Sequence, residues 1–261
     1  MTAVITGASS GIGYAAAELL YKNGYMVYGV SRSKSGVEFM KEIPADVTDT
    51  ESLRSALNVI IEESKTIDLL IACAGTGLSS PVERTDMSDA RYLFDVNFFG
   101  VAETVSFFLP IMKERRGGKI IIISSMAGIL PLPYECFYSA SKAALCAYAG
   151  SLHNEAKLFG ISVSAILPGG VRTGFTRKRK RYEELYPMFS GYRKAVETLS
   201  REEQTGLYAK QVARDILKLV KRKKPPEVAV SGGIYKLYYM MLRILPLRII
   251  LFVLRKKYMG V

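Results

Sequence analysis

Near its N-terminus this 261-residue chain reads Thr2-Ala3-Val4-Ile5-Thr6-Gly7-Ala8-Ser9-Ser10-Gly11-Ile12-Gly13, and this stretch decides the fold. Residues 2–6 are rich in β-branched side chains, which predicts a strand, and a helix-forming stretch then runs to Asn23. Glycines between a strand and a helix let the backbone approach a pyrophosphate, whose charge the helix N-terminus stabilises. The sequence therefore predicts an anion-binding turn with contacts from Gly7, Ser9, Ser10, Gly11, Ile12 and Gly13.

Strand and helix patterns alternate along the rest of the chain. Further strands are predicted at residues 25–30, 42–45, 68–72, 119–123, 161–167 and 227–230. Helices are predicted at residues 50–63, 88–113 and 134–159, and another ends at about Lys224. Residues 119–123 are continuously apolar, which is typical of a central strand buried on both faces. The order predicts an α/β fold with a doubly wound, Rossmann-type parallel sheet of about seven strands, helices on both faces and ligands at the carboxyl ends of its strands.

Composition and charge narrow the class of protein. With 49% apolar residues, the chain can bury a large core without disulfides or metals. Cys73, Cys136 and Cys146 lack paired spacing, so we expect no disulfide framework, no metal site and a reducing compartment, with Cys136 a buried apolar residue. No leader pattern precedes the first strand, so a cytoplasmic location is expected. The net charge of +12 indicates attraction to anions, but no recognised nucleic-acid module accompanies it.

Tyr138 and Lys142 are spaced to share one face of the predicted helix 134–159. An ammonium beside a phenol favours the phenolate, so Lys142 is expected to lower the pKa of Tyr138 and make it a proton donor or acceptor. Ser125 ends a predicted strand and could present its hydroxyl to the same substrate oxygen. Asn97 lies within the predicted helix 88–113, where it either solvates a group inside the protein or is a tolerated exception.

The residues after the second strand bear on the choice of cofactor. An acid at this position would bond a ribose 2′-hydroxyl and repel a 2′-phosphate. The chain instead has Ser31-Arg32-Ser33-Lys34, and the guanidinium of Arg32 suits a phosphate, so NADP is predicted over NAD. The alternative is that Arg32 and Lys34 are solvated loop charges. Asp46 is expected to bond an adenine amino group or to cap the next segment.

A hydrolase is the competing interpretation of the glycine turn, because Gly7-Ala8-Ser9-Ser10-Gly11 fits the pattern G-x-S-x-G. A nucleophilic Ser9 would need a base later in the chain. The only histidine is His153, which we expect on a helix surface. One short strand precedes the turn where a nucleophile elbow normally follows several, so this interpretation is disfavoured.

Taken together, these motifs resemble the short-chain dehydrogenase/reductase family over about residues 1–232. The resemblance implies an adenine contact at Asp46 and Val47, and cofactor contacts at Ala74 and Gly75 in Ala72-Cys73-Ala74-Gly75, where the family usually has two Asn before Ala-Gly. It implies a catalytic tetrad of Asn97, Ser125, Tyr138 and Lys142, of which Asn97, Tyr138 and Lys142 also contact the cofactor. Pro168-Gly169-Gly170-Val171-Arg172-Thr173 resembles the segment that holds the nicotinamide carboxamide, with contacts from Pro168, Gly169, Val171 and Thr173.

The resemblance also implies a mechanism. NADPH would deliver hydride to a carbonyl carbon while Tyr138 donates a proton to its oxygen and Ser125 polarises that oxygen. Lys142 would bind ribose hydroxyls, and Asn97 would help hold a water that relays protons. The prediction is a carbonyl reductase for a lipophilic, steroid- or lipid-like ketone or aldehyde. The alternatives are NADP-dependent alcohol oxidation and a cofactor-binding scaffold without turnover.

Two segments fall outside the cofactor motifs. Residues 174–206 would form a substrate lid, in which the basic run 177–181 is either a solvated flank or a site of attraction for anionic lipid. Residues 233–261 form an apolar and basic tail whose uncharged run 249–254 is too short to span a bilayer. The tail either lies on a membrane surface or packs on its own domain or a partner subunit and shapes the pocket. The family implies a homodimer or homotetramer through the long helices.

Overall fold

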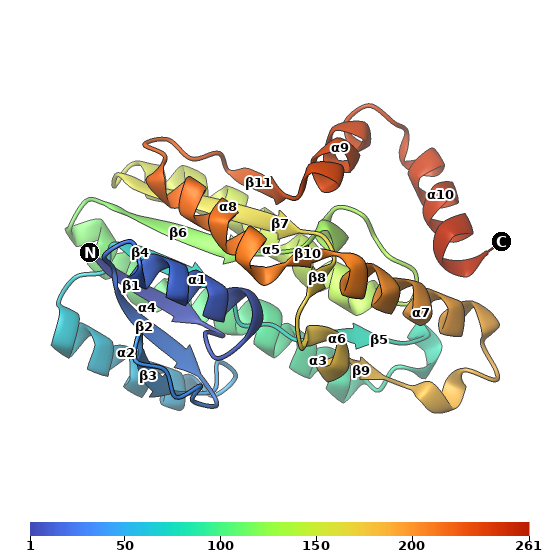
Figure 1. The fold of residues 1–261 in the computed structure, drawn as a ribbon, viewed down its shortest axis with the longest axis horizontal. Helices are drawn as coiled ribbons and strands as arrows, with labels where there is room; N and C mark the ends of the chain where they lie inside the picture. The colour runs from blue at the N-terminus through green and yellow to red at the C-terminus, as the bar shows by residue number, and fades with distance from the viewer. Residues whose placement is uncertain (261) are drawn as a thin grey trace.

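Seven parallel strands form the main sheet of the computed structural model, which describes residues 1–260, and helices cover both of its faces (Figure 1). The strand order is β11-β7-β6-β4-β1-β2-β3, so the predicted doubly wound sheet is confirmed. The strands are β1 (Thr2–Thr6), β2 (Met26–Ser31), β3 (Lys41–Pro44), β4 (Leu69–Ala72), β6 (Gly118–Ile123), β7 (Ile161–Pro168) and β11 (Val228–Ser231).

The register of the sheet brings the loops after several strands to one edge. Thr6 at the end of β1 pairs with Val30 of β2 and with Ala72 at the end of β4. Ala72 in turn pairs with Ile122 of β6. Because parallel strands run in the same direction, the glycine turn after β1 and the loops after β4 and β6 meet at this edge.

Two hydrophobic cores lie on opposite faces of the sheet. Helices α1 (Gly11–Tyr21) and α8 (Ala209–Lys221) pack on one face, and α2 (Thr50–Ser64), α4 (Gly100–Glu114) and α5 (Cys136–Lys157) cover the other. The side chains of β6 show why its sequence does not alternate: Ile121 belongs to the first core, whereas Ile120 and Ile122 belong to the second. The predicted burial of this strand on both faces is confirmed.

The boundaries of two predicted helices need correction. The helix containing Tyr138 begins at Cys136 and not at residue 134, because Tyr134 has a left-handed backbone with φ of 61°. Helix α8 ends at Lys221, three residues before the predicted end, because Arg222 is already extended ahead of the two prolines. Both differences are local and leave the order of elements unchanged.

One long helical path corresponds to the predicted helix 88–113. It consists of α3 (Met87–Phe94), the π-helical turn η2 (Asp95–Phe99) and α4. By length and composition, residues 87–114 would suffice to cross a membrane. In this fold, however, Val105, Phe108 and Met112 are fully buried against the sheet, so the path is a core helix.

The second half of the chain adds a layer beside the carboxyl edge of the sheet (Figure 1). Short strands pair as β5 with β9 and β8 with β10, and the tail forms two helices joined by a bend. The remaining elements are β5 (Leu78–Ser79), η1 (Val82–Arg84), η3 (Met126–Gly128), β8 (Val171–Arg172), α6 (Phe175–Lys178), β9 (Lys180–Arg181), η4 (Glu183–Leu185), α7 (Ser190–Thr205), β10 (Leu207–Tyr208), α9 (Gly233–Leu242) and α10 (Leu247–Met259).

The tail folds back onto the lid segment. Ile250, Leu254 and Tyr258 of α10 are buried against Ala195 and Leu199 of α7. These side chains lie four residues apart and therefore share one face of α10. One of the two alternatives for residues 233–261 was packing on the chain's own domain. This packing explains why one face of α10 is buried.

Candidate active site

A cavity of about 1170 Å³ opens at the carboxyl edge of the sheet. All but two of the predicted site residues line it. The two exceptions, Gly13 and Asn97, lie directly behind the lining residues. Residues from the tail, among them Tyr235, Leu245 and Val253, line the cavity at its other end. The structure thus gathers residues predicted from separate motifs around one space, and adds the tail to it.

The glycine turn has a shape that side chains would block. Gly7 has φ of 68°, in the left-handed region that glycine favours, and a Cβ on it would lie 2.9 Å from the Ala74 backbone. A Cβ on Gly13 would overlap the carbonyl oxygen of Gly7, so the first turn of α1 packs directly on the loop. Free backbone N–H groups at the start of α1 therefore face the cavity without side chains in front of them.

Thr6 joins this turn to the loop after β4. Its Oγ1 accepts hydrogen bonds from the backbone N–H groups of Cys73 and Ala74, at 3.1 and 3.3 Å. The departure from the two usual Asn residues at positions 72 and 73 therefore leaves this loop anchored to β1. Cys73 itself is half-buried, and burial raises the pKa of its thiol to about 11.

Arg32 and Asp46 form the wall of the cavity beside β2. The guanidinium of Arg32 is exposed, donates to the hydroxyl of Tyr92 at 2.9 Å and lies 3.9 Å from the carboxylate of Asp46. Asp46 Oδ1 accepts hydrogen bonds from both the backbone N–H and the hydroxyl of Thr48. This oxygen therefore caps the next segment, which was one of the two roles predicted for Asp46. Ser31 Oγ accepts from the backbone N–H of Ser9 at 3.0 Å and thereby joins β2 to the glycine turn.

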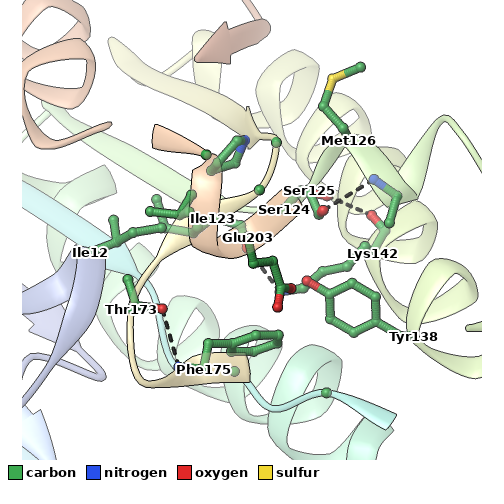
Figure 2. Close-up of a pocket in the computed structure, with 18 of the residues that line it drawn as sticks. Ile12, Ile123, Ser124, Ser125, Met126, Tyr138, Lys142, Thr173, Phe175 and Glu203 are labelled. Atoms are coloured by element: carbon green, nitrogen blue, oxygen red, sulfur yellow. Dashed lines mark hydrogen bonds between the residues drawn. The ribbon is translucent and has the colours of Figure 1, made fainter. Parts of the chain in front are cut away.

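Tyr138 and Lys142 lie one helical turn apart on α5, with the Lys142 ammonium 5.8 Å from the centroid of the Tyr138 ring. Lys142 Nζ donates to the backbone carbonyl of Ile123 at the end of β6, at 3.2 Å. Ser125 follows β6 and, like the other two, lines the cavity (Figure 2). The hydroxyls of Tyr138 and Ser125, which were predicted to share a substrate oxygen, and the ammonium of Lys142 thus line the same cavity.

Burial has the largest effect on the pKa values of Tyr138 and Lys142, and it corrects the expected direction for Tyr138. It raises the pKa of Tyr138 well above its ordinary value, and Glu135 adds to this effect, while Arg179 and Ser125 oppose it. The pKa of Tyr138 therefore does not fall as predicted. Burial lowers the pKa of Lys142 itself to about 8. Tyr138 is consequently a protonated phenol at neutral pH and has a proton to donate.

Asn97 lies in the π-helical turn η2 and is fully buried. Its amide accepts from the backbone N–H of Thr76 at 2.8 Å and donates to the Thr76 carbonyl at 3.0 Å and the Ser141 hydroxyl at 3.0 Å. Of the two alternatives for a mid-helix Asn, the structure shows the first, because this side chain satisfies polar groups inside the protein. A Cβ on Gly75 would lie 3.4 Å from Asn97 Oδ1 and 3.5 Å from Lys142 Nζ.

The tail packs against the segment 168–173. The ring of Tyr235 on α9 covers Gly169 so closely that a Cβ there would overlap it, and its hydroxyl accepts from the backbone N–H of Gly170 at 3.0 Å. Thr173 Oγ1 accepts from the backbone N–H of Phe175 and begins the lid (Figure 2). Sequence reasoning missed Tyr235, because its contact joins residues 65 positions apart.

Sequence reasoning also missed a buried charged cluster in the cavity wall. Arg179 Nε lies 3.1 Å from Glu135 Oε1, both side chains are almost fully buried, and the Arg179 Nη2 donates to Glu203. The basic run 177–181 is therefore neither wholly a solvated flank nor wholly a basic surface, since Arg179 points inward. The available signal was Glu135, three residues before Tyr138 and hence close to it in space.

Two other expectations are wrong. His153 is not on a helix surface: it is buried, and its Nδ1 lies 2.9 Å from the Val163 carbonyl on β7. Because His153 is not among the residues that line the cavity, the hydrolase interpretation has no base near Ser9. Cys136 is exposed and not buried, because it is the first residue of α5 and faces outward there.

The arrangement fits a phosphorylated dinucleotide. The cavity lining includes the Arg32 wall after β2, the bare glycine turn after the neighbouring β1, and the polar group of Tyr138 and Lys142 beside β6. Backbone N–H groups without overlying side chains suit a pyrophosphate, and the exposed Arg32 guanidinium suits a further phosphate. Among residues 1–260, no cluster of three or more His, Cys, Asp or Glu side chains has a geometry that would hold a metal ion.

Comparisons with known proteins agree with this geometry. A family model described as short chain dehydrogenase matches residues 1–184. The chain is 37% identical over 227 residues to a 3-ketodihydrosphingosine reductase of Bacteroides thetaiotaomicron, with 85% of this chain and 84% of the relative covered. It is 33% identical over 236 residues to an NADPH-dependent 1-acyldihydroxyacetone phosphate reductase of Saccharomyces cerevisiae, covering 82% and 78%. A short-chain dehydrogenase structure from Streptomyces avermitilis superimposes with a TM-score of 0.81, at 28% identity, over 92% of this chain and 91% of that one.

Proposed function

The chain belongs to the short-chain dehydrogenase/reductase family of oxidoreductases, and from this premise we propose that it reduces the carbonyl group of a lipophilic, lipid- or steroid-like ketone or aldehyde with NADPH. The observation that carries the proposal is the position of Tyr138. Its protonated phenol lies beside Lys142 and Ser125 in a cavity that continues into an apolar end lined by the tail. A proton donor at the junction of a cofactor site and an apolar space suits a lipophilic carbonyl substrate.

Each polar group has a role in this proposal. NADPH supplies the hydride when bound. Tyr138 donates its phenolic proton to the substrate oxygen, and Ser125 donates a hydrogen bond that fixes the same oxygen. Lys142, with a pKa lowered to about 8, replaces the proton on Tyr138 and binds the ribose hydroxyls. Asn97 keeps the loop at Thr76 in place behind Lys142 and so positions the site.

The apolar end of the cavity supports a lipid-like substrate. Leu130 and Leu132 line it from the loop before α5, and Leu245, Ile250 and Leu254 line it from the tail. Both relatives named above reduce lipid-related carbonyl compounds, as their names state. We propose that residues 233–260 are an extension of the catalytic domain, residues 1–232, that completes the pocket for an alkyl chain, with residues 174–206 as its lid.

NADP is the proposed form of the cofactor. Arg32 stands at the end of β2, where the ribose 2′-position of a bound dinucleotide falls in doubly wound folds, and no acidic residue lies between Ser31 and Lys34. Ser31 and Val47 line the same wall of the cavity. The Saccharomyces cerevisiae relative is NADPH-dependent by name, which supports this choice.

The test is consumption of NADPH by the purified protein with long-chain and steroid ketones. We expect turnover in the parent and a loss of at least about a hundredfold in Tyr138→Phe, because a positioned proton donor contributes about 10²–10⁴ in rate. Ser125→Ala should lose activity while binding NADPH like the parent. Undiminished turnover by Tyr138→Phe would remove Tyr138 from the reaction. Steady turnover only with alcohols and NADP⁺ would favour the oxidative direction, and no turnover either way would favour a cofactor-binding scaffold.

We also propose that the outer face of the tail contacts an anionic membrane surface. Helices α9 and α10 and the bend between them expose large apolar side chains, among them Leu237, Met240, Ile244, Leu247 and Phe252. Residues 233–260 contain six Lys or Arg and no Asp or Glu. Exposed apolar groups among basic ones suit the interface of an anionic bilayer.

Point substitutions test this contact better than deletion of the tail, since deletion would remove Tyr235 from Gly169. We expect the parent to co-sediment with phosphatidylglycerol vesicles and not with phosphatidylcholine vesicles. Ile244→Glu and Phe252→Glu should reduce sedimentation at least about tenfold, because each places a charge on the contact face. Leu158→Glu is the matched control, as Leu158 is 77% exposed at the end of α5, far from the tail. Equal sedimentation of all variants would refute the proposed surface.

We further propose a cytoplasmic location and association into an oligomer. Three free cysteines among the described residues suit a reducing compartment, in agreement with the expected cytoplasmic location. The long helices α4 and α5 suit association into a homodimer or homotetramer, and Phe99 at the start of α4 is exposed. Light scattering of the purified protein would measure its oligomeric state.

A further inference from the structure

The buried charged cluster of Glu135, Arg179 and Glu203 belongs to the same cavity as the proton donor Tyr138. Glu135, Arg179 and Glu203 all line the cavity, as does Phe175, whose ring centroid is 5.9 Å from that of Tyr138. Arg179 Cζ lies 5.5 Å from the centroid of Phe175 on the other side. Figure 2 shows Glu203 and Phe175 on the wall next to Tyr138. A substrate with its carbonyl at Tyr138 would therefore place a neighbouring substituent close to this cluster.

Arg179 is fixed in position and has spare hydrogen-bond donors. Its stem passes Gly77, where a Cβ would lie 3.2 Å from Arg179 Cγ, and β9 pairs with β5 immediately after it. Arg179 Nη2 donates to Glu203, and Nε lies 3.1 Å from Glu135 Oε1. Its Nη1 is buried and has no hydrogen-bond partner among residues 1–260. An unsatisfied buried donor is costly, so an acceptor on a bound molecule would stabilise it.

The groups around Arg179 decide what kind of ligand group is suitable. Carboxyl oxygens of Glu135 and Glu203 lie within 4 Å of Arg179, and burial raises the pKa of Glu135. Lys178 also lines the cavity, so the charges of its wall do not by themselves exclude a phosphate. A hydroxyl both donates and accepts, so it can bond to the guanidinium and to a carboxyl oxygen at the same time.

We propose that Arg179, Glu135 and Glu203 form a subsite for a hydroxyl group on a carbon next to the reacting carbonyl of the substrate. The hydroxyl oxygen accepts from Arg179 Nη1, and its hydrogen donates to a carboxyl oxygen of the cluster. This subsite deepens the proposed function, on which it rests, because it specifies the substrate class as hydroxylated alkyl ketones. Arg179 is in this sense a specificity-determining residue, since its contact is with the headgroup.

Binding to the NADP⁺-loaded protein tests the subsite without relying on turnover. Calorimetric titration compares two ligands of equal medium chain length: an alkyl diol with adjacent terminal hydroxyls and the simple alkyl alcohol. In the diol, one hydroxyl stands for the product alcohol at Tyr138 and the other for the headgroup. We expect the diol to bind at least about tenfold more tightly than the alcohol, as sites built around hydrogen bonds reject ligands that lack them.

Two variants assign the preference to the cluster. Arg179→Met should remove the advantage of the diol over the alcohol, and Glu203→Gln should reduce it, because an amide oxygen is a weaker acceptor than a carboxylate. Arg179→Lys replaces Arg179→Met if that variant fails to fold, as judged by thermal melting and NADPH titration. Equal binding of diol and alcohol by the parent would overturn the subsite. A diol preference in a protein that reduces no hydroxylated ketone would instead contradict the proposed reaction and leave the subsite standing.

Discussion

Asn97 holds the main chain of Thr76 at both of its polar atoms. Its Oδ1 accepts from the Thr76 N–H at 2.8 Å, and its Nδ2 donates to the Thr76 carbonyl at 3.0 Å. The π-helical turn places this side chain inside the path from α3 to α4, where a regular helix would present it differently. The loop after β4, which lines the cavity next to Lys142, therefore depends on a residue that is itself fully buried.

Loss of this clamp should destabilise the protein and disturb the site. In Asn97→Ala, two partly buried backbone groups of Thr76 lose their partners, and each unsatisfied buried group costs about 1–3 kcal/mol. We expect the free energy of unfolding to fall by about 3 kcal/mol, measured by urea denaturation. Asn97→Asp keeps the acceptor for the Thr76 N–H but loses the donor to the Thr76 carbonyl. Its free energy of unfolding should therefore fall less than that of Asn97→Ala. An unchanged denaturation midpoint in Asn97→Ala would show that water replaces the clamp.

Two glycines in helical positions should respond oppositely to alanine. Gly13→Ala places a methyl group onto the Gly7 carbonyl, so we expect lower stability and at least about a tenfold loss of NADPH affinity. Gly150→Ala, in α5 with nothing near its added methyl, should raise the free energy of unfolding by about 1 kcal/mol. Thermal melting and cofactor titration of both variants measure the difference. Similar behaviour of the two would mean that the turn relaxes around Gly13.

Arg32 should decide between the two nicotinamide dinucleotides. In Arg32→Ala we expect NADPH affinity to fall at least about tenfold, because a charge-assisted bond to the 2′-phosphate is lost, with little change for NADH. Fluorescence titration of both cofactors gives the ratio. Lys34→Ala is the matched control, because Lys34 is a nearby exposed cation that does not line the cavity. Equal affinities for NADPH and NADH in the parent would contradict the proposed preference.

The buried ammonium of Lys142 should lower the free energy of unfolding at neutral pH. The unfolded chain keeps this proton up to about pH 10.5, whereas the folded protein releases it at about pH 8. Since the unfolded state binds more protons between these values, the contribution of Lys142 to stability rises with pH across this window and is lowest below about pH 8. The shift corresponds to about 3 kcal/mol, from which the lost bond to Ile123 subtracts about 1 kcal/mol.

Lys142→Met is therefore expected to be about 2 kcal/mol more stable than the parent at pH 7, to lose this advantage above about pH 10.5, and to be inactive. Urea denaturation at several pH values provides the measurement. Lys157→Met is the control, as Lys157 lies exposed on the same helix. A variant less stable than the parent at pH 7 would show that the ammonium is better solvated than its burial indicates.

Tyr235 should link the tail to the cofactor site. Tyr235→Phe keeps the ring on Gly169 and leaves the Gly170 N–H without its acceptor, so we expect a stability loss of about 1 kcal/mol and a raised KM for NADPH. Tyr235→Ala also uncovers Gly169 and should lose more of both. Tyr238→Phe is the control, because Tyr238 is a tyrosine on the same helix but is more exposed. Unaltered cofactor kinetics in Tyr235→Ala would separate the tail from the cofactor site.

Local pattern was sufficient to predict much of this protein. The strand, glycine turn and helix at residues 2–13, the apolar strand ending before Ser125 and the helical spacing of Tyr138 and Lys142 each involve neighbours along the chain, and local sequence governs their geometry. The order of these elements then restricts a parallel sheet to few topologies, and the carboxyl ends of its strands necessarily share one edge. The fold and most of the cavity's cofactor side followed from this.

Burial and long-range contacts were decided by the tertiary structure alone. Arg179 belongs to a run that the sequence alone predicts to be exposed, yet pairing of β9 with β5 turns it inward to Glu135 and Glu203. His153 is buried where exposure was expected, and Cys136 is exposed where burial was expected, because packing between distant segments decides both. The pKa of Tyr138 rises and does not fall, since desolvation depends on everything packed around the phenol and not on Lys142 only. The sequence by itself determined which groups meet at the sheet edge, because spacing and strand order are local properties. Packing between distant segments determined their charge state and the shape of the substrate end, because neither can be computed from neighbours in the chain.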